Sequence, residues 1–183
     1  MPEIKATTVV PVAQSVVFDF VGDSRNAPRW VFGVHRVEPG APHPLRPGDH
    51  VTFQLGAAGQ RLESRWRIDE WTPPTHVTSS GHALGARAQL RIECRALGPE
   101  ATEVVEVLRY QLPGGVLGMV ADRLGIHGIL EMQARNSMRA LRRLLTPPAP
   151  GRAGAQDRRA EARAAAGGAA RERPAAGGGT DGG

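Results

Sequence analysis

The chain has 183 residues, enough for one domain with a sizeable core. Its net charge of +5 results from 23 Lys and Arg against 18 Asp and Glu, and the two signs are interspersed without a basic run. This pattern argues against nucleic acid as a partner. Cys94 is the only cysteine, which excludes an intrachain disulfide and a multi-cysteine metal site. Because the histidines also lack metal-ligand spacing, we expect neither a metal nor another cofactor.

Two further features concern location and domain organisation. The sequence contains no run of 18 apolar residues, and its start, MPEIKATTVV, lacks a secretory leader pattern. We therefore expect a soluble cytoplasmic protein without a membrane span. Residues 147–183 are dense in Gly, Ala, Pro and Arg and carry no aliphatic side chain larger than alanine. Such a segment buries too little apolar surface to fold, so we expect a disordered tail after a folded domain over residues 1–146.

The first third of the domain predicts one strand and two short helices. Residues 3–10 are rich in β-branched side chains, which favours a strand ending at Pro11. Apolar residues at helical spacing predict a helix over residues 11–21, because proline is tolerated in a first helical turn. A second short helix over residues 26–31, capped by Asp23 or Ser24, would direct Trp30 inward.

The middle of the chain predicts a series of strands joined by short turns. Their expected ranges are 34–38, 49–55, 60–71, 76–84, 86–96 and 102–112. In residues 60–71 the side chains of Leu62, Trp66 and Ile68 alternate with charged ones, so one face of the strand is dry and the other wet. Strands that follow one another through short turns form an antiparallel meander, whose dry face must pack against another element.

The apolar partner of that face is the C-terminal helix, which follows the Pro-Gly-Gly break after the last strand and ends near Leu145. Its apolar side chains form two stripes, one containing Leu117, Val120 and Leu124 and the other running from Leu130 to Leu145. The stripes are offset by roughly 90° at 100° per residue. The offset falls at two glycines, so we expect one long helix that is kinked at Gly125 and Gly128.

Three stretches of the sequence resemble the START-related SRPBCC superfamily, in particular its polyketide cyclase/dehydrase and lipid-transport branch. They are PVAQSVVFDFVGDSRNAPRW at 11–30, WRIDEWTPPTHV at 66–77, and VLRYQLPGGVLGMVADRL at 107–124 with SMRALRRLL at 137–145. The resemblance implies an α+β helix-grip fold, in which a curved antiparallel sheet of about six or seven strands wraps around the long C-terminal helix and two short helices follow the first strand. It also implies an apolar cavity between sheet and helix that takes a hydrophobic small molecule, polyketide-like or lipid-like.

The expected ligand-binding residues lie on the faces that would border this cavity. They are Trp30, Phe53, Ser64, Trp66, Leu90, Tyr110, Leu117, Val120 and Leu124. The family has no universal catalytic motif that can be carried over to this chain, so function has to be argued from the site.

Three polar residues are candidates for general acid/base chemistry. Glu106 alternates with Val104 and Leu108 in the last strand, which places its carboxyl among apolar side chains. A register slip that turns Val105 and Val107 inward and leaves Glu106 in solvent is an alternative. His127 lies between the two glycines of the helix, and Glu131 follows at i+4, where it could orient the imidazole. The alternative for His127 is a purely structural histidine.

Three functions remain open from sequence. The first is binding of a hydrophobic, polyketide-like ligand with cyclisation or dehydration by acid/base catalysis. The second is a carrier of lipids or other hydrophobic molecules that performs no chemistry. The third is a protein-interaction module of the same fold, to which the arginine-bearing tail contributes.

Overall fold

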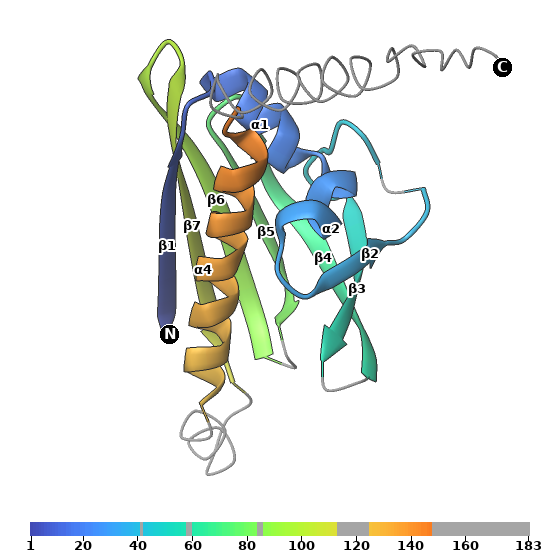
Figure 1. Ribbon diagram of the computed structural model, residues 1–183. Coiled ribbons are helices and arrows are strands. Elements are labelled where there is room, and N and C mark those ends of the chain that lie inside the picture. Colours follow the sequence, from blue (N-terminus) through green and yellow to red (C-terminus); the bar gives the residue numbers. More distant parts are fainter. Residues whose placement is uncertain (41, 58–59, 84–85, 113–124, 148–183) are drawn as a thin grey trace, which may run out of the picture. The chain divides into compact units, whose positions relative to one another are not determined.

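The computed structural model describes residues 1–40, 42–57, 60–83, 86–112 and 125–147 (Figure 1). Residues 1–146 form one compact unit. The predicted tail after Pro147 and the first predicted stripe of the C-terminal helix, with Leu117, Val120 and Leu124, lie outside the described residues. None of the described helices is long and apolar enough to cross a membrane.

The elements follow the expected order, and the strand boundaries are close to those predicted. They are β1 Glu3–Val10, α1 Gln14–Gly22, a 3-10 turn Ser24–Asn26, α2 Ala27–Trp30, β2 Val34–Val37, β3 His50–Ala57, β4 Gln60–Thr72, β5 His76–Ala83, β6 Ala86–Gly98, β7 Ala101–Gln111 and α4 Ile126–Leu145. The strands form one seven-stranded antiparallel sheet in the order β1-β7-β6-β5-β4-β3-β2. The curved sheet lies behind α4, and α1 and α2 cover the same face (Figure 1). The predicted helix-grip architecture is confirmed.

The core lies between the concave face of the sheet and one stripe of α4. Leu130, Ala134, Met138 and Leu141 of α4 are each 3% exposed or less, and they belong to the same apolar cluster as the inward side chains of the sheet. Fully burying a leucine or methionine side chain stabilises a fold by about 1.5–3 kcal/mol. This packing therefore holds α4 in place to a greater extent than its intrinsic helix propensity does.

The predicted dry face of β4 is buried as expected at Trp66 and Ile68. A β-bulge between Ile68 and Glu70 then shifts the register by one residue. The shift turns Trp71 back to the concave side, where its ring lies 5.1 Å from that of Phe18 in α1. The bulge therefore brings Trp71 onto the same face of β4 as Trp66 and Ile68.

The C-terminal helix departs from the sequence prediction at Gly125. This residue has a φ of 89° and lies in the left-handed region, and α4 begins at Ile126. Because an α-helix needs right-handed backbone angles at every residue, the expected helix does not run through Gly125 with a kink. Gly128 lies inside the first turn of α4.

Candidate functional site

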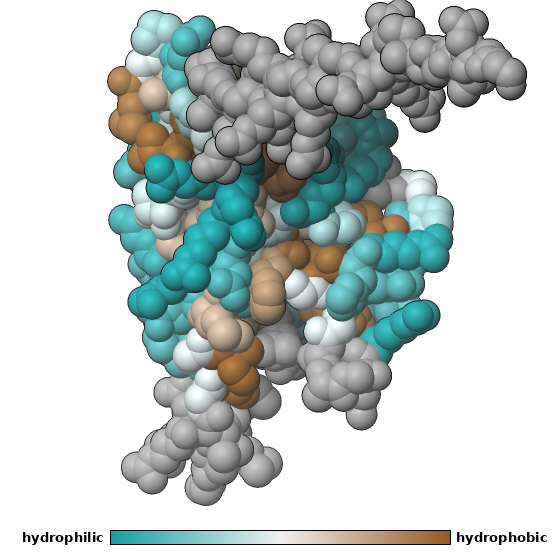
Figure 2. Space-filling view, in the orientation of Figure 1, coloured by the Kyte–Doolittle hydropathy of each residue, from teal (hydrophilic) through white to brown (hydrophobic). Residues whose placement is uncertain are grey.

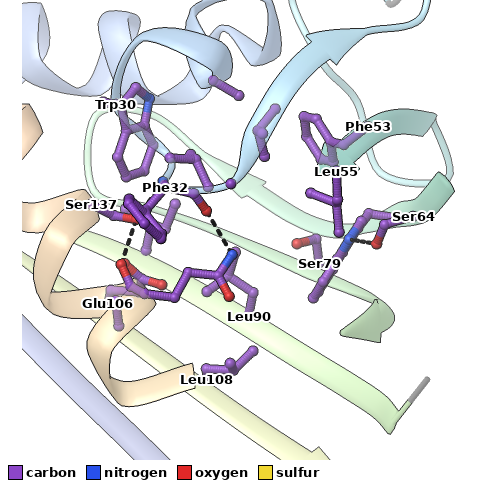
Figure 3. Close-up of a pocket in the computed structure, with 18 of the residues that line it drawn as sticks. Trp30, Phe32, Phe53, Leu55, Ser64, Ser79, Leu90, Glu106, Leu108 and Ser137 are labelled. Atoms are coloured by element: carbon purple, nitrogen blue, oxygen red, sulfur yellow. Dashed lines mark hydrogen bonds between the residues drawn. The ribbon is translucent and has the colours of Figure 1, made fainter. Parts of the chain in front are cut away.

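A cavity of about 240 Å³ lies between the concave face of the sheet, α2 with the loop that follows it, and α4 (Figure 3). Its wall is largely apolar, with side chains from β3 to β7 on one side and from α4 on the other. Of the expected ligand-binding residues, five border the cavity: Trp30, Phe53, Ser64, Trp66 and Leu90. Tyr110 is fully buried but is not among the described lining residues.

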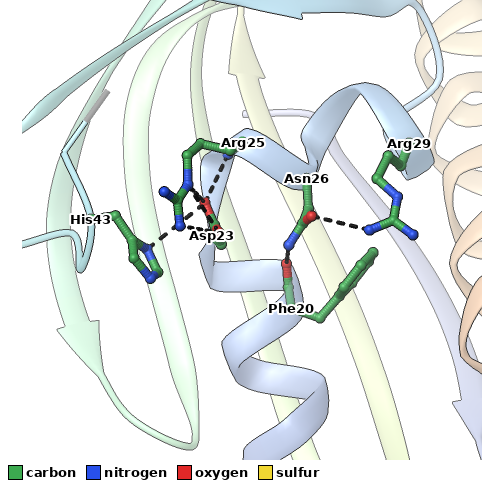
Figure 4. Close-up of polar contacts among 6 residues, drawn as sticks. All are labelled: Phe20, Asp23, Arg25, Asn26, Arg29 and His43. Atoms are coloured by element: carbon green, nitrogen blue, oxygen red, sulfur yellow. Dashed lines mark hydrogen bonds and ion pairs between the residues drawn. The ribbon is translucent and has the colours of Figure 1, made fainter. Parts of the chain in front are cut away.

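Trp30 reaches the cavity because a set of polar contacts fixes the turn that precedes α2 (Figure 4). Asp23 accepts hydrogen bonds from the backbone N–H and the guanidinium of Arg25, and Arg25 holds the pKa of the Asp23 carboxyl below its usual range. Asn26 donates from Nδ2 to the carbonyl oxygen of Phe20 at 3.1 Å. These bonds fix the angle between α1 and α2, so the side chain of Trp30 points inward and is only 4% exposed.

Glu106 of β7 places a carboxyl on the cavity wall. It lies opposite Ala6 of β1 and Ile92 of β6 in the sheet register, and Val104 and Leu108 of the same face belong to the core. The alternative register, with Val105 facing the core, is not adopted: Val105 is buried but lies outside the core cluster.

One oxygen of the Glu106 carboxyl lacks compensation for its burial. Its Oε2 atom is buried without a hydrogen-bond partner among the described residues, and the part of the side chain that remains accessible borders the cavity. Burial raises the pKa of this carboxyl to about 7, because an apolar surrounding disfavours the charged form. Near neutral pH, the group is therefore able both to hold and to release a proton.

Two other residues that border the cavity also carry a buried polar atom without a partner among the described residues. They are Ser24, at the start of the 3-10 turn, with its Oγ, and Trp30, with its Nε1. Within the described part of the chain, these two atoms and Glu106 Oε2 are the buried side-chain N and O atoms that have no partner. Buried polar groups in folded proteins are almost always hydrogen-bonded, so these three residues at the border of one cavity stand out within the described part of the chain.

Ser64 differs from these atoms because its hydrogen-bonding capacity is used locally. Its Oγ donates to the carbonyl oxygen of His82 at 2.6 Å and accepts from Nε1 of Trp66 at 2.8 Å. The Trp66 ring in turn lies over Gly81 of β5, where a Cβ atom would come within 2.7 Å of the indole. Ser64 therefore orients the Trp66 side chain of the cavity wall.

The other two catalytic candidates lie apart from Glu106. His127 is exposed and is not among the described lining residues, and its Nδ1 lies 3.0 Å from the Tyr110 hydroxyl. The expected contact between Glu131 and His127 is not formed, since the Glu131 carboxylate accepts a hydrogen bond from Arg135 one turn further along α4. The structure therefore does not bring the three candidates together, and a catalytic role for His127 and Glu131 stays a prediction.

Sequence reasoning missed a clamp between α4 and the loop that joins α2 to β2. The backbone N–H of Phe32 donates to Ser137 Oγ at 2.9 Å, and Gln133 Nε2 donates to the Phe32 carbonyl oxygen at 2.7 Å (Figure 3). Ser137 completes the arrangement by donating to the carbonyl oxygen of Gln133. All three residues border the cavity. A serine in the apolar stripe of α4 was the visible signal in the sequence, but its partner lies 105 positions away.

Among the described residues, no group of three or more His, Cys, Asp and Glu side chains is placed to hold a metal ion. Cys94 is buried in the core, and burial raises the pKa of its thiol to about 12.

A curved antiparallel sheet that encloses an apolar cavity against one C-terminal helix defines a helix-grip protein. Residues 1–146 match the family model described as polyketide cyclase/dehydrase and lipid transport. The chain therefore belongs to this family, as its resemblance to the SRPBCC superfamily implied. Hydrophobic ligand binding is the function that membership suggests. No curated protein shows detectable sequence similarity to the chain.

Solved structures with the same fold are distant in sequence. TTHA0849 from Thermus thermophilus is 17% identical with a TM-score of 0.64, over 78% of this chain and 95% of that protein. The ZhuI aromatase/cyclase from Streptomyces sp. R1128 is 14% identical with a TM-score of 0.63, over 76% and 90%. A START superfamily protein from Mycobacterium smegmatis is 16% identical with a TM-score of 0.50, over 73% and 96%. At these identities, the likeness establishes the fold alone.

Proposed function

We propose that this protein binds a hydrophobic small molecule that carries oxygen substituents, with its apolar body in the cavity between the sheet and α4. The observation that carries the proposal is that Ser24, Trp30 and Glu106, which all border one apolar cavity, each carry a polar atom without a partner among the described residues. An apolar wall with a few polar groups that fix orientation is typical of small-molecule sites. Similarity to an aromatase/cyclase supports a cyclic ligand.

The three atoms differ in what they require from a ligand. The indole N–H of Trp30 is a donor only and calls for an acceptor such as a keto oxygen. Glu106 donates when protonated and accepts when ionised, so it fits a hydroxyl or phenol in either state. The volume of about 240 Å³ lies just below the roughly 300–1,000 Å³ of drug-sized pockets. The proposed ligand is therefore compact, on the scale of one or two fused rings bearing keto or hydroxyl groups.

A second candidate function is proton transfer to such a ligand, as in dehydration or cyclisation of a carbonyl compound. It is favoured by the pKa of about 7 for Glu106, because an acid/base catalyst works best when its pKa is near the working pH. The carrier hypothesis and the enzyme hypothesis differ in one outcome. In Glu106→Gln, an enzyme loses turnover but retains ligand, whereas a carrier has no turnover to lose.

The proposal is tested first by native mass spectrometry of the purified protein, in which a co-purified small molecule of mass consistent with an oxygenated ring system is expected. A defined comparison uses 1-naphthol and naphthalene, which differ by one hydroxyl. We expect 1-naphthol to bind about tenfold more tightly, as is typical of one hydrogen bond to a buried polar group. Glu106→Leu should abolish the difference, and Glu103→Leu, on the other face of β7, should preserve it. Absence of binding by either compound would refute the proposed function.

A further inference from the structure

A second hollow, of about 770 Å³, lies between α2 and the C-terminal half of α4. It differs from the cavity in its chemistry, because four arginines border it. They are Arg29 from α2 and Arg139, Arg142 and Arg143 from α4, joined by Asn136. A concave site with several guanidinium groups is suited to bind a carboxylate or a phosphate, which planar arginines contact through paired N–H groups.

These arginines lack acidic partners within the described part of the chain, in contrast to six others that form ion pairs with Asp or Glu. Two contacts position the guanidinium of Arg29. It donates to Asn26 Oδ1 at 3.3 Å, and it lies over the Phe20 ring, 5.1 Å from the ring centre. Arg142 and Arg143 lie in the last turn of α4, where a cation also stabilises the helix dipole. That effect does not explain Arg29, which belongs to another helix and faces the same hollow.

The hollow and the cavity share a wall. Residues 30–34, which include Trp30 and Phe32, line both. On α4, the cavity-lining Gln133 and the hollow-lining Asn136 are three residues apart, about 4.5 Å along the helix axis. Arg143 is ten residues beyond Gln133, about 15 Å along the axis.

The edge of the cavity is marked by apolar side chains that remain in contact with solvent. Phe32, Ile129 and Met132 line the cavity and are 49%, 48% and 50% exposed. Figure 2 shows hydrophobic surface in the gap between α4 and the β2–β3 side of the molecule. A ligand that extends out of the cavity past Phe32 therefore leaves an apolar surface and meets a basic one.

From this arrangement we infer that the arginine-lined hollow binds an acidic group, a carboxylate or a phosphate, on the outer end of the molecule whose apolar part occupies the cavity. The inference rests on the proposed function, since it assigns the acidic end of the same ligand. It makes the preferred ligand an anionic amphiphile rather than a neutral hydrophobic compound.

The test uses two probes with the same decyl chain, 1-decanol and decyl phosphate, which differ in the phosphate group. Decyl phosphate is kept below its micelle-forming concentration and decanol below its solubility limit. Both compete with the neutral fluorophore N-phenyl-1-naphthylamine, whose own binding reports on the cavity. We expect decyl phosphate to displace the fluorophore at about tenfold lower concentration than decanol at low salt, because several exposed arginines contact one anion. The advantage should fall at 0.5 M NaCl, where screening is strong.

Matched variants test whether the tighter binding of decyl phosphate depends on the arginines of the hollow. Arg139→Gln combined with Arg143→Gln should bring decyl phosphate to the level of decanol and leave decanol and the fluorophore unchanged. The control pair Arg65→Gln and Arg87→Gln removes the same charge from exposed strand positions outside the hollow and should keep the advantage. Equal affinities of the two probes for the wild-type protein, or an equal loss in the control pair, would overturn the inference.

Two further outcomes distinguish a failure of the proposed function from a failure of the inference about the hollow. If neither probe nor the fluorophore binds, the proposed function itself fails. If calorimetry detects saturable binding of inorganic phosphate alone, while decanol and decyl phosphate bind equally, the hollow is a site for a free anion and the inferred link to the cavity is wrong.

Discussion

Replacing Glu106 by glutamine is expected to remove a large part of the pH dependence of stability. The side chain keeps its shape but loses its proton equilibrium. In wild type, burial raises the pKa of the carboxyl from an ordinary 4.5 to about 7. Below pH 4.5 the group is protonated in both the folded and the unfolded chain. As the pH rises through 7, the folded protein must carry a buried charge, so the stabilisation present at low pH is lost. The difference between the two pKa values corresponds to a loss of about 3 kcal/mol from the free energy of unfolding.

The measurement is urea unfolding followed by tryptophan fluorescence at pH 5 and pH 8. The free energy of unfolding of Glu106→Gln, relative to wild type, should rise by up to about 2.5 kcal/mol between the two pH values, because part of the effect already falls between pH 4.5 and pH 5. The rise is smaller if water enters the cavity and solvates the carboxylate. Glu63→Gln, at an exposed position of β4, should show no such change. An identical pH dependence in wild type and Glu106→Gln would refute the assignment of a buried, uncompensated carboxyl.

Three other results are expected. Ser137→Ala removes the oxygen that accepts from the Phe32 N–H, so amide hydrogen exchange at Phe32 should become about tenfold faster or more. Gly81→Ala would place a Cβ atom 2.6 Å from a backbone oxygen and 2.7 Å from the Trp66 ring, and it should lower the free energy of unfolding by about 1–3 kcal/mol. The Cys94 thiol, buried and with its pKa raised to about 12, should react with a disulfide reagent only after unfolding.

Each of these results has an internal comparison. Gly98→Ala, where nothing lies within 4 Å of the added atom, should leave stability nearly unchanged. The exchange of amides in β1, remote from the clamp, should be the same in Ser137→Ala and wild type. Rapid labelling of Cys94 in the native protein would contradict the packing of β6 against the core.

The strands were predictable because burial on one face leaves a period of two in the sequence. The alternation around Ile92 in β6 and around Leu108 in β7 survives in the structure, and it placed Glu106 on the cavity wall. The β4 bulge after Ile68 was not predicted, since a one-residue insertion leaves no signal other than a change of phase. The start of α4 was misjudged because glycine is compatible with a weak helix and with a left-handed residue alike, and Gly125 adopts the latter.

The site was only partly predictable, for a different reason. Trp30 and Phe53 could be assigned to a cavity wall from their size and apolar setting. The clamp on Phe32 and the hollow around Arg29 and Arg139 arise where α2 and α4 meet. These segments are about 100 residues apart, and no local pattern records their contact. The choice of His127 as an acid/base candidate relied on one long helix kinked at Gly125 and Gly128, whereas α4 begins only after Gly125.

The pairing of β1 with β7 has a consequence for how the binding site forms during folding. The register pairs Ala6 with Glu106. Strand β1, the first to be synthesised, therefore cannot pair until β7, the last strand, has been synthesised. Closing a loop of about 100 residues is entropically costly, and contacts of such long range slow folding. Glu106 therefore becomes enclosed only late, when the sheet completes its edge. A chain stalled before β7 would hold a nearly complete sheet but no binding carboxyl, and its β1 strand would remain open to non-native pairing.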